Sequence, residues 1–166
     1  MSRKYNVQIG DKARDKVSGL VGTVTCRKEH LFGNIQFVIA PHNDSGDTIN
    51  DPYAFDWQQL ELVEEAVIDV TPHKITNDVE LGDVVKDQIT KVQGTVTSIW
   101  FWLNGCVEAL IEYSDGEGGE NGVRSSIDRF KVKEKARIKR DAPEVKEKVA
   151  RATGGPSMRI PRESIK

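Results

Sequence analysis

Cysteine is scarce in this chain of 166 residues, and long hydrophobic runs are absent. Two cysteines, Cys26 and Cys106, are too few for a disulfide framework, which indicates a reducing compartment. No stretch approaches the roughly 18 apolar residues of a membrane span, and the first ten residues lack a signal-peptide pattern. These absences predict a protein that stays in the cytoplasm.

The motifs of common enzyme classes are also missing. The only Gly-rich run, residues 115–122, is acidic and would repel a phosphate group. Cys26 and His30 have no second pair of ligands at zinc spacing, and no Ser elbow or Cys–His pair with an orienting third group is visible. The acidic loops at 42–51 and 115–122 lack EF-hand spacing and are rich in turn residues, although calcium binding by them stays open. The sequence predicts no enzyme activity, no cofactor and no metal site.

Charge is distributed unevenly along the chain. Residues 1–130 hold 12 Lys and Arg against 21 Asp and Glu, a net charge of −9, whereas residues 131–166 hold 12 against 5, a net charge of +7. An acidic body with a basic tail is typical of a chain whose tail meets a partner. The tail could meet nucleic acid or the acidic body of a neighbouring copy, or it could simply be solvated.

An internal repeat is the most informative feature of the sequence. Residues 9–26 read IGDKARDKVSGLVGTVTC and residues 81–98 read LGDVVKDQITKVQGTVTS, so the two segments superpose at an offset of 72 without a gap. The same offset matches further residues downstream, namely Leu31 with Leu103, Gly33 with Gly105 and Asp56 with Asp128. We therefore expect two similar units, and we interpret the recurring carboxylates as turn caps rather than catalytic groups.

Apolar residues within each unit alternate with a period of two. In the first unit these are Val17, then Val24 and Cys26, then Ile35, Phe37 and Ile39. This period and the enrichment in Thr, Val and Ile indicate half-buried strands. A sheet of so few strands is expected to curl into a small closed barrel.

The repeated motif resembles the opening hairpin of SH3-like barrels, including the KOW type. The resemblance rests on Gly-Asp, a hydrophobic residue, a turn and Gly-Thr-Val-Thr, carried by Gly10, Asp11, Val17, Gly22 and Val24 and by Gly82, Asp83, Ile89, Gly94 and Val96. Tandem units with a basic tail that contains GGP are also similar to small proteins encoded by tailed bacteriophages. The second resemblance implies a location in the virion or the host cytoplasm.

The predicted fold is all-β, with two tandem SH3-like barrels from an internal duplication, a short helix and an extended basic arm. The expected boundaries are barrel 1 at 1–63, a connector at 64–79, barrel 2 at 80–133 and the tail at 134–166. In the tail, Val145 and Val149 share one helical face, and Gly-Gly-Pro at 154–156 ends the helix.

Two aromatic groups stand out. Ile99-Trp100-Phe101-Trp102 replaces Arg27-Lys28-Glu29-His30 of the first unit, so the fold itself does not require large apolar side chains there. Trp100 and Trp102 share one face of an extended segment and form either a partner interface or a contact with the connector or the first unit. Tyr53, Phe55 and Trp57 alternate on another expected strand and are better explained as core than as a ligand platform.

These observations favour a non-enzymatic structural or interaction protein, an accessory (decoration or stabilising) component of a bacteriophage particle. Its expected partners are capsid or other virion proteins in a repetitive assembly, with no membrane. The alternative is a KOW-like nucleic-acid-binding regulatory protein, which the acidic body disfavours. The predicted partner-binding residues are Trp100, Phe101, Trp102, Lys135, Arg137, Lys139, Arg140, Val145, Val149, Arg159 and Arg162.

Overall fold

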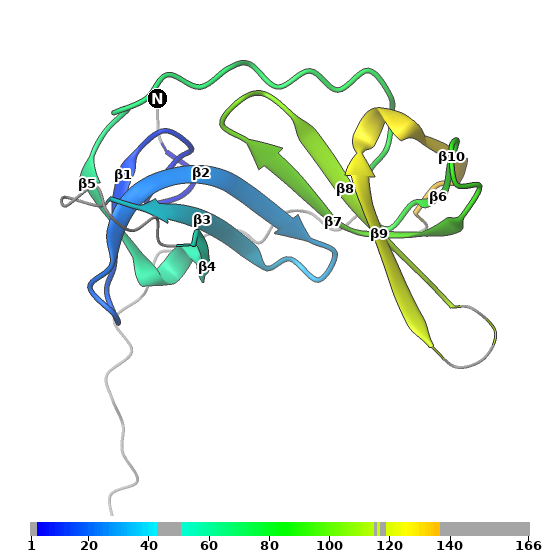
Figure 1. The fold of residues 1–166 in the computed structure, drawn as a ribbon, viewed down its shortest axis with the longest axis horizontal. Coiled ribbons are helices and arrows are strands. Elements are labelled where there is room, and N and C mark those ends of the chain that lie inside the picture. Colours follow the sequence, from blue (N-terminus) through cyan, green and yellow to red (C-terminus); the bar gives the residue numbers. More distant parts are fainter. Residues whose placement is uncertain (1–2, 43–50, 115, 117–118, 137–166) are drawn as a thin grey trace, which may run out of the picture.

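The chain folds into β-strands joined in one sheet. The computed structural model describes residues 3–42, 51–114, 116 and 119–136. Strands of the first half are β1 (Lys12–Asp15), β2 (Val21–His30), β3 (Ile35–Pro41), β4 (Tyr53–Asp56) and β5 (Leu60–Glu64), and those of the second half are β6 (Val84–Asp87), β7 (Gln93–Trp102), β8 (Val107–Ser114), β9 (Glu120–Ser126) and β10 (Phe130–Glu134). Short 3-10 turns, η1 (Trp57–Gln59) and η2 (Ile127–Arg129), precede β5 and β10 (Figure 1). The fold is therefore all-β, as predicted, while the expected helix and arm lie outside the described residues.

Each half of the chain is an antiparallel unit with the same pairing pattern. We call residues 3–64 the first unit, 65–76 the connector and 77–136 the second unit. In the first unit β1 pairs with β2 and β5, and β3 pairs with β2 and β4. In the second unit β6 pairs with β7 and β10, and β8 pairs with β7 and β9. The two units meet where β2 pairs with β7, so the described strands form one ten-stranded sheet.

The long strands β2 and β7 can serve two sets of neighbours because a β-bulge divides each of them. The register between β2 and β3 shifts between Val24 and Cys26, and the register between β7 and β8 shifts between Val96 and Ser98. A bulge bends the strand and changes the face to which the following side chains point. Before the bulge β2 pairs with β1 and β3, and after it with β3 and β7; β7 likewise exchanges β6 for β2 while it stays paired with β8.

Glycine is required just before each bulge by a close backbone approach. A Cβ atom on Gly22 would lie 2.1 Å from the Ala40 carbonyl oxygen, and one on Gly94 would lie 2.5 Å from the Glu112 carbonyl oxygen. Such contacts would push the neighbouring strand away. The Gly-Thr-Val-Thr motif thus begins with a glycine for a packing reason.

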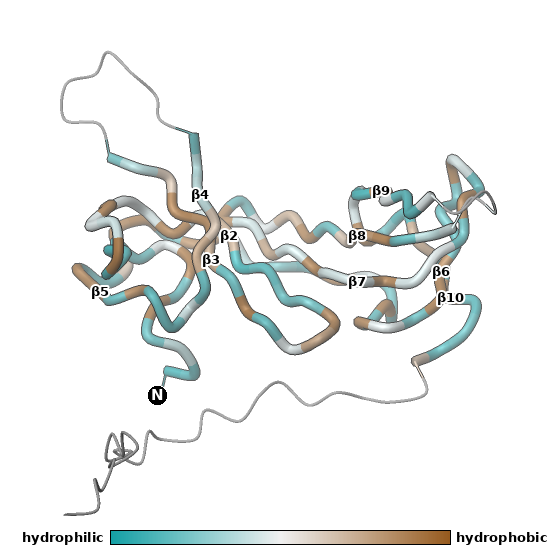
Figure 2. Tube along the Cα trace, turned by 90° about the horizontal axis from the view of Figure 1, so that it is seen from below, coloured by the Kyte–Doolittle hydropathy of each residue, from teal (hydrophilic) through white to brown (hydrophobic). Residues whose placement is uncertain are grey.

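Each unit has its own hydrophobic core. The first core consists of Tyr5, Val7, Ala13, Val24, Ile35, Phe37, Ile39 and Leu60. The second consists of Val79, Val85, Val96, Ile99, Val107, Ala109, Ile111, Ile127 and Phe130. Along the strands of both units hydrophobic residues are interspersed with hydrophilic ones, as expected of strands with one buried face (Figure 2).

The positional match between the units is gapless only in their first three strands. β1 and β6, β2 and β7, and β3 and β8 begin 72 residues apart, whereas β5 and β10 begin 70 apart. Gln36 pairs with Asp56 and Glu108 pairs with Ser126, so the structural equivalent of Asp56 is Ser126. The sequence match of Asp56 with Asp128 is therefore wrong, because the second unit is two residues shorter before its last strand.

Two further expectations about single residues need correction. Val17, expected on a strand, lies in the turn after β1 with 80% of its surface exposed, and its equivalent Ile89 is 69% exposed. Tyr53 is 52% exposed, whereas Phe55 and Trp57 pack against the first core as predicted. Val17 lies in a turn and Tyr53 lies next to a loop, so each fits the alternating sequence pattern although its side chain is exposed.

Candidate interaction surface

The two units are joined by an antiparallel ladder between the second halves of β2 and β7. Residues Cys26 to His30 pair with Trp102 to Ser98 in reverse order. Beyond the ladder, Leu31 donates its backbone N–H to the Thr97 carbonyl at 2.8 Å, and Leu103 donates to the Thr25 carbonyl, also at 2.8 Å. The offset of 72 converts one of these two bonds into the other, since it relates Leu31 to Leu103 and Thr25 to Thr97, so the junction has a local two-fold arrangement.

Lys28 and Trp100 lie on this local two-fold. They are 72 residues apart, and they are also directly opposite each other in the ladder. Two identical residues at this position would face each other, and like charges in that arrangement are unfavourable. Arg27–His30 and Ile99–Trp102 therefore differ because they pair with each other, and the polar segment complements the aromatic one across the junction.

Trp100 is held between two cations on the outward face of the sheet. The Lys28 Nζ lies 3.9 Å from the centre of the Trp100 ring system, and the Arg124 Cζ lies 4.3 Å from it. Burial lowers the pKa of Lys28, as does the nearby charge of Arg124, although the Cys26 thiol opposes this. These cation–π contacts tie β7 both to β2 and to β9.

Trp102 lies beside Trp100 on the same face, as the sequence predicted. The two ring centres are 5.9 Å apart, and both residues are half-buried. The indole N–H of Trp100 donates to Ser98 Oγ at 3.0 Å, and that of Trp102 donates to Glu108 Oε2 at 2.9 Å. The polar atoms of both indoles are thus satisfied within the chain, and Lys28 and Arg124 lie over the Trp100 ring.

Phe101 points to the other side of the sheet and contacts the connector. Its ring lies 4.4 Å from the Arg27 Cζ, and the His73 ring meets it edge-on with centres 5.5 Å apart. The His73 Nε2 donates to the Trp102 carbonyl at 2.7 Å, and the Thr71 backbone donates to the Leu103 carbonyl. Of the three predicted aromatic contact residues, only Trp100 and Trp102 therefore belong to the outward face.

Cys26 lies beneath this outward face, directly opposite Trp102 and Val38. The residue is fully buried, as predicted, but the bulge turns it away from the core that contains Val24. Burial raises the pKa of its thiol to about 12, with a further increase from Glu108 that Lys28 and Arg124 offset. The thiol is therefore protonated near neutral pH and is a poor nucleophile.

Four buried carboxylates organise turns in the two units. Asp11 accepts from the backbone N–H groups of Gln8 and Ala66, and Asp83 accepts from those of Glu80 and Ala136. Asp15 and Asp87 accept from the turns that follow β1 and β6, through the backbone and hydroxyl of Ser18 and through Ile89 and Thr90. The bonds of Asp11 and Asp83 agree with their interpretation as turn caps. Asp56 and Asp128 do not fit that interpretation, because Asp56 makes no side-chain cap bond and accepts from the Asn34 and Gln36 side chains, and Asp128 accepts from the Thr76 hydroxyl.

Lys135, assigned by its charge to the partner-binding arm, forms ion pairs inside the second unit. Its Nζ lies 3.0 Å from Asp83 Oδ2 and 3.4 Å from Asp78 Oδ2, and it donates to the Asp78 carbonyl. Arg3 has the matching role in the first unit, with NH1 2.7 Å from Asp11 Oδ2. The other predicted arm residues, which lie outside the described residues, are Arg137, Lys139, Arg140, Val145, Val149, Arg159 and Arg162.

Comparisons with protein-family models, curated proteins and solved structures found no match for this chain. Among the residues that the structure describes, no group of three or more His, Cys, Asp or Glu side chains is arranged to hold a metal ion. Within the same residues, none of the helices has the length and apolar character needed to cross a membrane.

Proposed function

We propose that this protein is a non-enzymatic structural protein, an accessory (decoration or stabilising) component of a bacteriophage particle. In this proposal its two units are SH3-like barrels that arose by duplication. It docks on protein neighbours through the outward face of the junction and through the basic arm. The observation that carries the proposal is the joining of two units into one sheet, which displays Trp100 and Trp102 on a single face.

The equivalent positions of strands, bulges and turn carboxylates support a duplication. Both units use an Asp that caps a preceding turn, an Asp that organises the following turn and a bulge in the long strand. Independent origins would not be expected to reproduce these three local devices in one order. Small barrels of this kind are scaffolds for recognition, and function depends on what the surface displays.

Two pockets in the described residues hold no hydroxyl or thiol that is hydrogen-bonded to a base. A pocket of about 400 Å³ lies against the N-terminal segment and the connector, lined by Lys4, Tyr5, Val7, Gln8, Ile9, Arg27, Phe37, Val70 and His73. A second pocket, of about 430 Å³, includes Thr71, Cys106 and Ser126 beside Glu108 and Asp128, but no hydrogen bond joins the first three side chains to the two carboxylates.

A KOW-like nucleic-acid binder is the second candidate, favoured by Trp100 between Lys28 and Arg124. Proteins that bind single-stranded nucleic acids stack the bases on aromatic rings and contact the phosphates with nearby cations. The net charge of −9 over residues 1–130 opposes this role, since affinity for nucleic acid depends on neutralising phosphates.

Density-gradient sedimentation of phage particles tests the proposal. Tagged full-length chain and a tagged variant that ends at Ala136 are supplied during infection, and the variant retains Lys135 and Ala136 because both contact Asp83. We expect the full chain to band with particles and the truncated chain to be bound several-fold less, with an unchanged circular dichroism spectrum. Absence of the full chain from particles would contradict the proposal, and sub-micromolar DNA binding that disappears with the arm would favour the second candidate.

A further inference from the structure

The second unit has a lysine groove that the first unit lacks. A groove of about 310 Å³ is lined by Lys86, Asp87, Gln88, Lys91, Lys131 and Lys133, which come from β6, the β6–β7 turn and β10. Asp87 is fully buried and its carboxylate is paired with Arg129, whose NH2 lies 2.5 Å from Oδ2. Within the described residues, none of the four lysine ammonium groups has a carboxylate within 4 Å. The groove thus concentrates positive charge in an otherwise acidic body.

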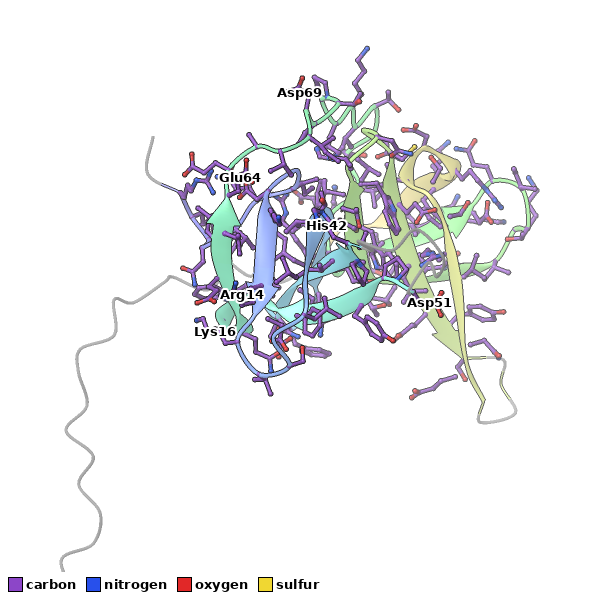
Figure 3. All side chains as sticks on the ribbon, turned by 60° about the vertical axis from the view of Figure 1, so that its left-hand side comes forward. Arg14, Lys16, His42, Asp51, Glu64 and Asp69 are labelled. Carbon is purple, nitrogen blue, oxygen red and sulfur yellow. The ribbon has the colours of Figure 1, made fainter. Side chains whose placement is uncertain are left out.

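Two of these lysines face each other across a strand pair. Lys86 of β6 is directly opposite Lys131 of β10. At the equivalent position of the first unit, Arg14 of β1 is opposite Glu61 of β5, with Arg14 NH1 3.3 Å from Glu61 Oε1. Figure 3 labels Arg14, which lies on β1 next to β5. Like charges directly opposite each other destabilise a sheet, and the first unit shows that the fold accepts an ion pair there.

A third lysine occupies a strained backbone position. Lys91 has a φ of +66°, whereas its equivalent in the first unit is Gly19 with a φ of +74°. A left-handed conformation is unfavourable for a residue with a Cβ atom and costs nothing for glycine. Two features of the groove therefore lower the stability of the second unit, namely the Lys86–Lys131 repulsion and the left-handed backbone of Lys91. Both place positive charge in the same groove.

Stability lost at a surface in return for a local cluster of charge is typical of a binding site. We infer that the lysine groove binds an acidic segment of a partner protein, one with several Asp or Glu side chains. This inference rests on the proposed function and names the chemistry of one docking site. Point-charge ammonium groups from two strands and a turn match carboxylates spaced along an extended peptide.

The surroundings of the groove favour a short acidic peptide over nucleic acid. No aromatic side chain lines the groove, so bases would have no stacking partner. The basic arm of the chain itself is excluded as an occupant by its charge.

Fluorescence anisotropy with a labelled octaglutamate peptide tests the inference on the full-length chain. Lys131→Glu creates an ion pair with Lys86 like that of the first unit and should raise the melting temperature while weakening peptide binding about tenfold. Lys91→Gly should also raise the melting temperature and weaken binding several-fold. The matched control Arg14→Glu makes the same change of net charge at the position equivalent to Lys86, and it should lower the melting temperature without changing peptide affinity.

Four results would overturn the inference. Equal weakening by Lys131→Glu and Arg14→Glu would mean that only net charge matters. Binding that survives Lys131→Glu but disappears on truncation after Ala136 would assign the peptide to the arm. Tighter binding of a single-stranded DNA oligonucleotide than of octaglutamate would identify a nucleic-acid site. If Lys131→Glu chain still bands with particles as the parent does, the proposed function stands and the groove inference fails.

Discussion

Asp15 and Asp87 occupy equivalent buried turns, yet only one of them has a cationic partner. Arg129 donates from Nε and NH2 to the two carboxylate oxygens of Asp87. Gln59 is the equivalent of Arg129 in the first unit. The equivalence follows from two matching backbone bonds, since the Lys16 N–H donates to the Gln59 carbonyl and the Gln88 N–H donates to the Arg129 carbonyl. Asp15 Oδ1 is consequently buried without a hydrogen-bond partner among the described residues.

Gln59→Arg should therefore stabilise the protein. A guanidinium at this position can reach Asp15 Oδ1, and a hydrogen bond to a buried charge adds about 1–2 kcal/mol to the free energy of unfolding. The reciprocal variant Arg129→Gln should lower it by about 2 kcal/mol, since it leaves Asp87 without its countercharge. Urea denaturation followed by circular dichroism measures both. Equal stability of Gln59→Arg and the parent would show that the Asp15 turn needs no cation.

Acid should weaken the fold through the same two carboxylates. Burial alone would raise the pKa of Asp15 and of Asp87, but hydrogen bonds from Ser18 to Asp15, and from Ile89, Thr90 and Arg129 to Asp87, outweigh it and hold each pKa below the ordinary 3.8. A lowered pKa in the folded state means that the stabilisation is complete above the unfolded value and is lost as the pH falls through the folded value. We expect the free energy of unfolding to decrease below about pH 4, and to decrease less steeply in Asp87→Asn. Parallel pH profiles for parent and variant would contradict this account.

At the scale of single strands, the pairing of β2 with β7 explains why the two units differ in sequence at Arg27–His30 and Ile99–Trp102. Val24 and Val96 belong to the cores, whereas Cys26, just after the bulge of β2, does not, and beyond the bulges β2 and β7 pair with each other. A local two-fold makes residues 28 and 100 each other's neighbours. Identical residues at these two positions would face each other, and their divergence to Lys28 and Trp100 gives a cation–π contact instead.

Exchanging the two residues tests this explanation. Trp100→Lys puts two lysines opposite each other and should lower the free energy of unfolding by about 2 kcal/mol, through loss of the cation–π contact and through charge repulsion. The double variant Lys28→Trp and Trp100→Lys should recover part of this loss, because the same pair is restored across the two-fold. Recovery is incomplete, since Arg124 has Ala54 as its equivalent in the first unit. A double variant no more stable than the sum of its singles would mean that the pair is uncoupled.

The sequence predicted the elements better than their assembly. Alternation and the repeat predicted an all-β fold, a buried Cys26 and a shared face for Trp100 and Trp102. The pairing of β2 with β7 was not predictable from local patterns, because it joins residues about 70 apart and depends on where each bulge lies. The face that Cys26 occupies could not be predicted from the sequence, because the bulge interrupts the alternation after Val24. The gapless alignment matched Asp56 with Asp128, because it did not include the loop that is two residues shorter in the second unit. The lysine groove could have been found by comparing charges between units once the two-residue shift was known.

At the scale of the whole molecule, continuity of the sheet makes the two units one platform. Five residue pairs of the ladder, two flanking hydrogen bonds and the cation–π contacts of Lys28 and Arg27 all cross between units. The connector adds the contacts of Thr71 and His73 with the end of β7. A platform held at so many points fixes the first unit relative to the Trp100, Trp102 and lysine-groove surfaces of the second unit.

Residual dipolar couplings of the backbone amides test this central claim most directly, because they report the orientation of each N–H bond relative to a common alignment frame. The account predicts that one alignment tensor fits the couplings of strands β1–β5 and β6–β10 together as well as it fits either set of strands alone. Separate tensors of different magnitude for the two sets would show that the units move independently, and the account of a single platform would then be wrong.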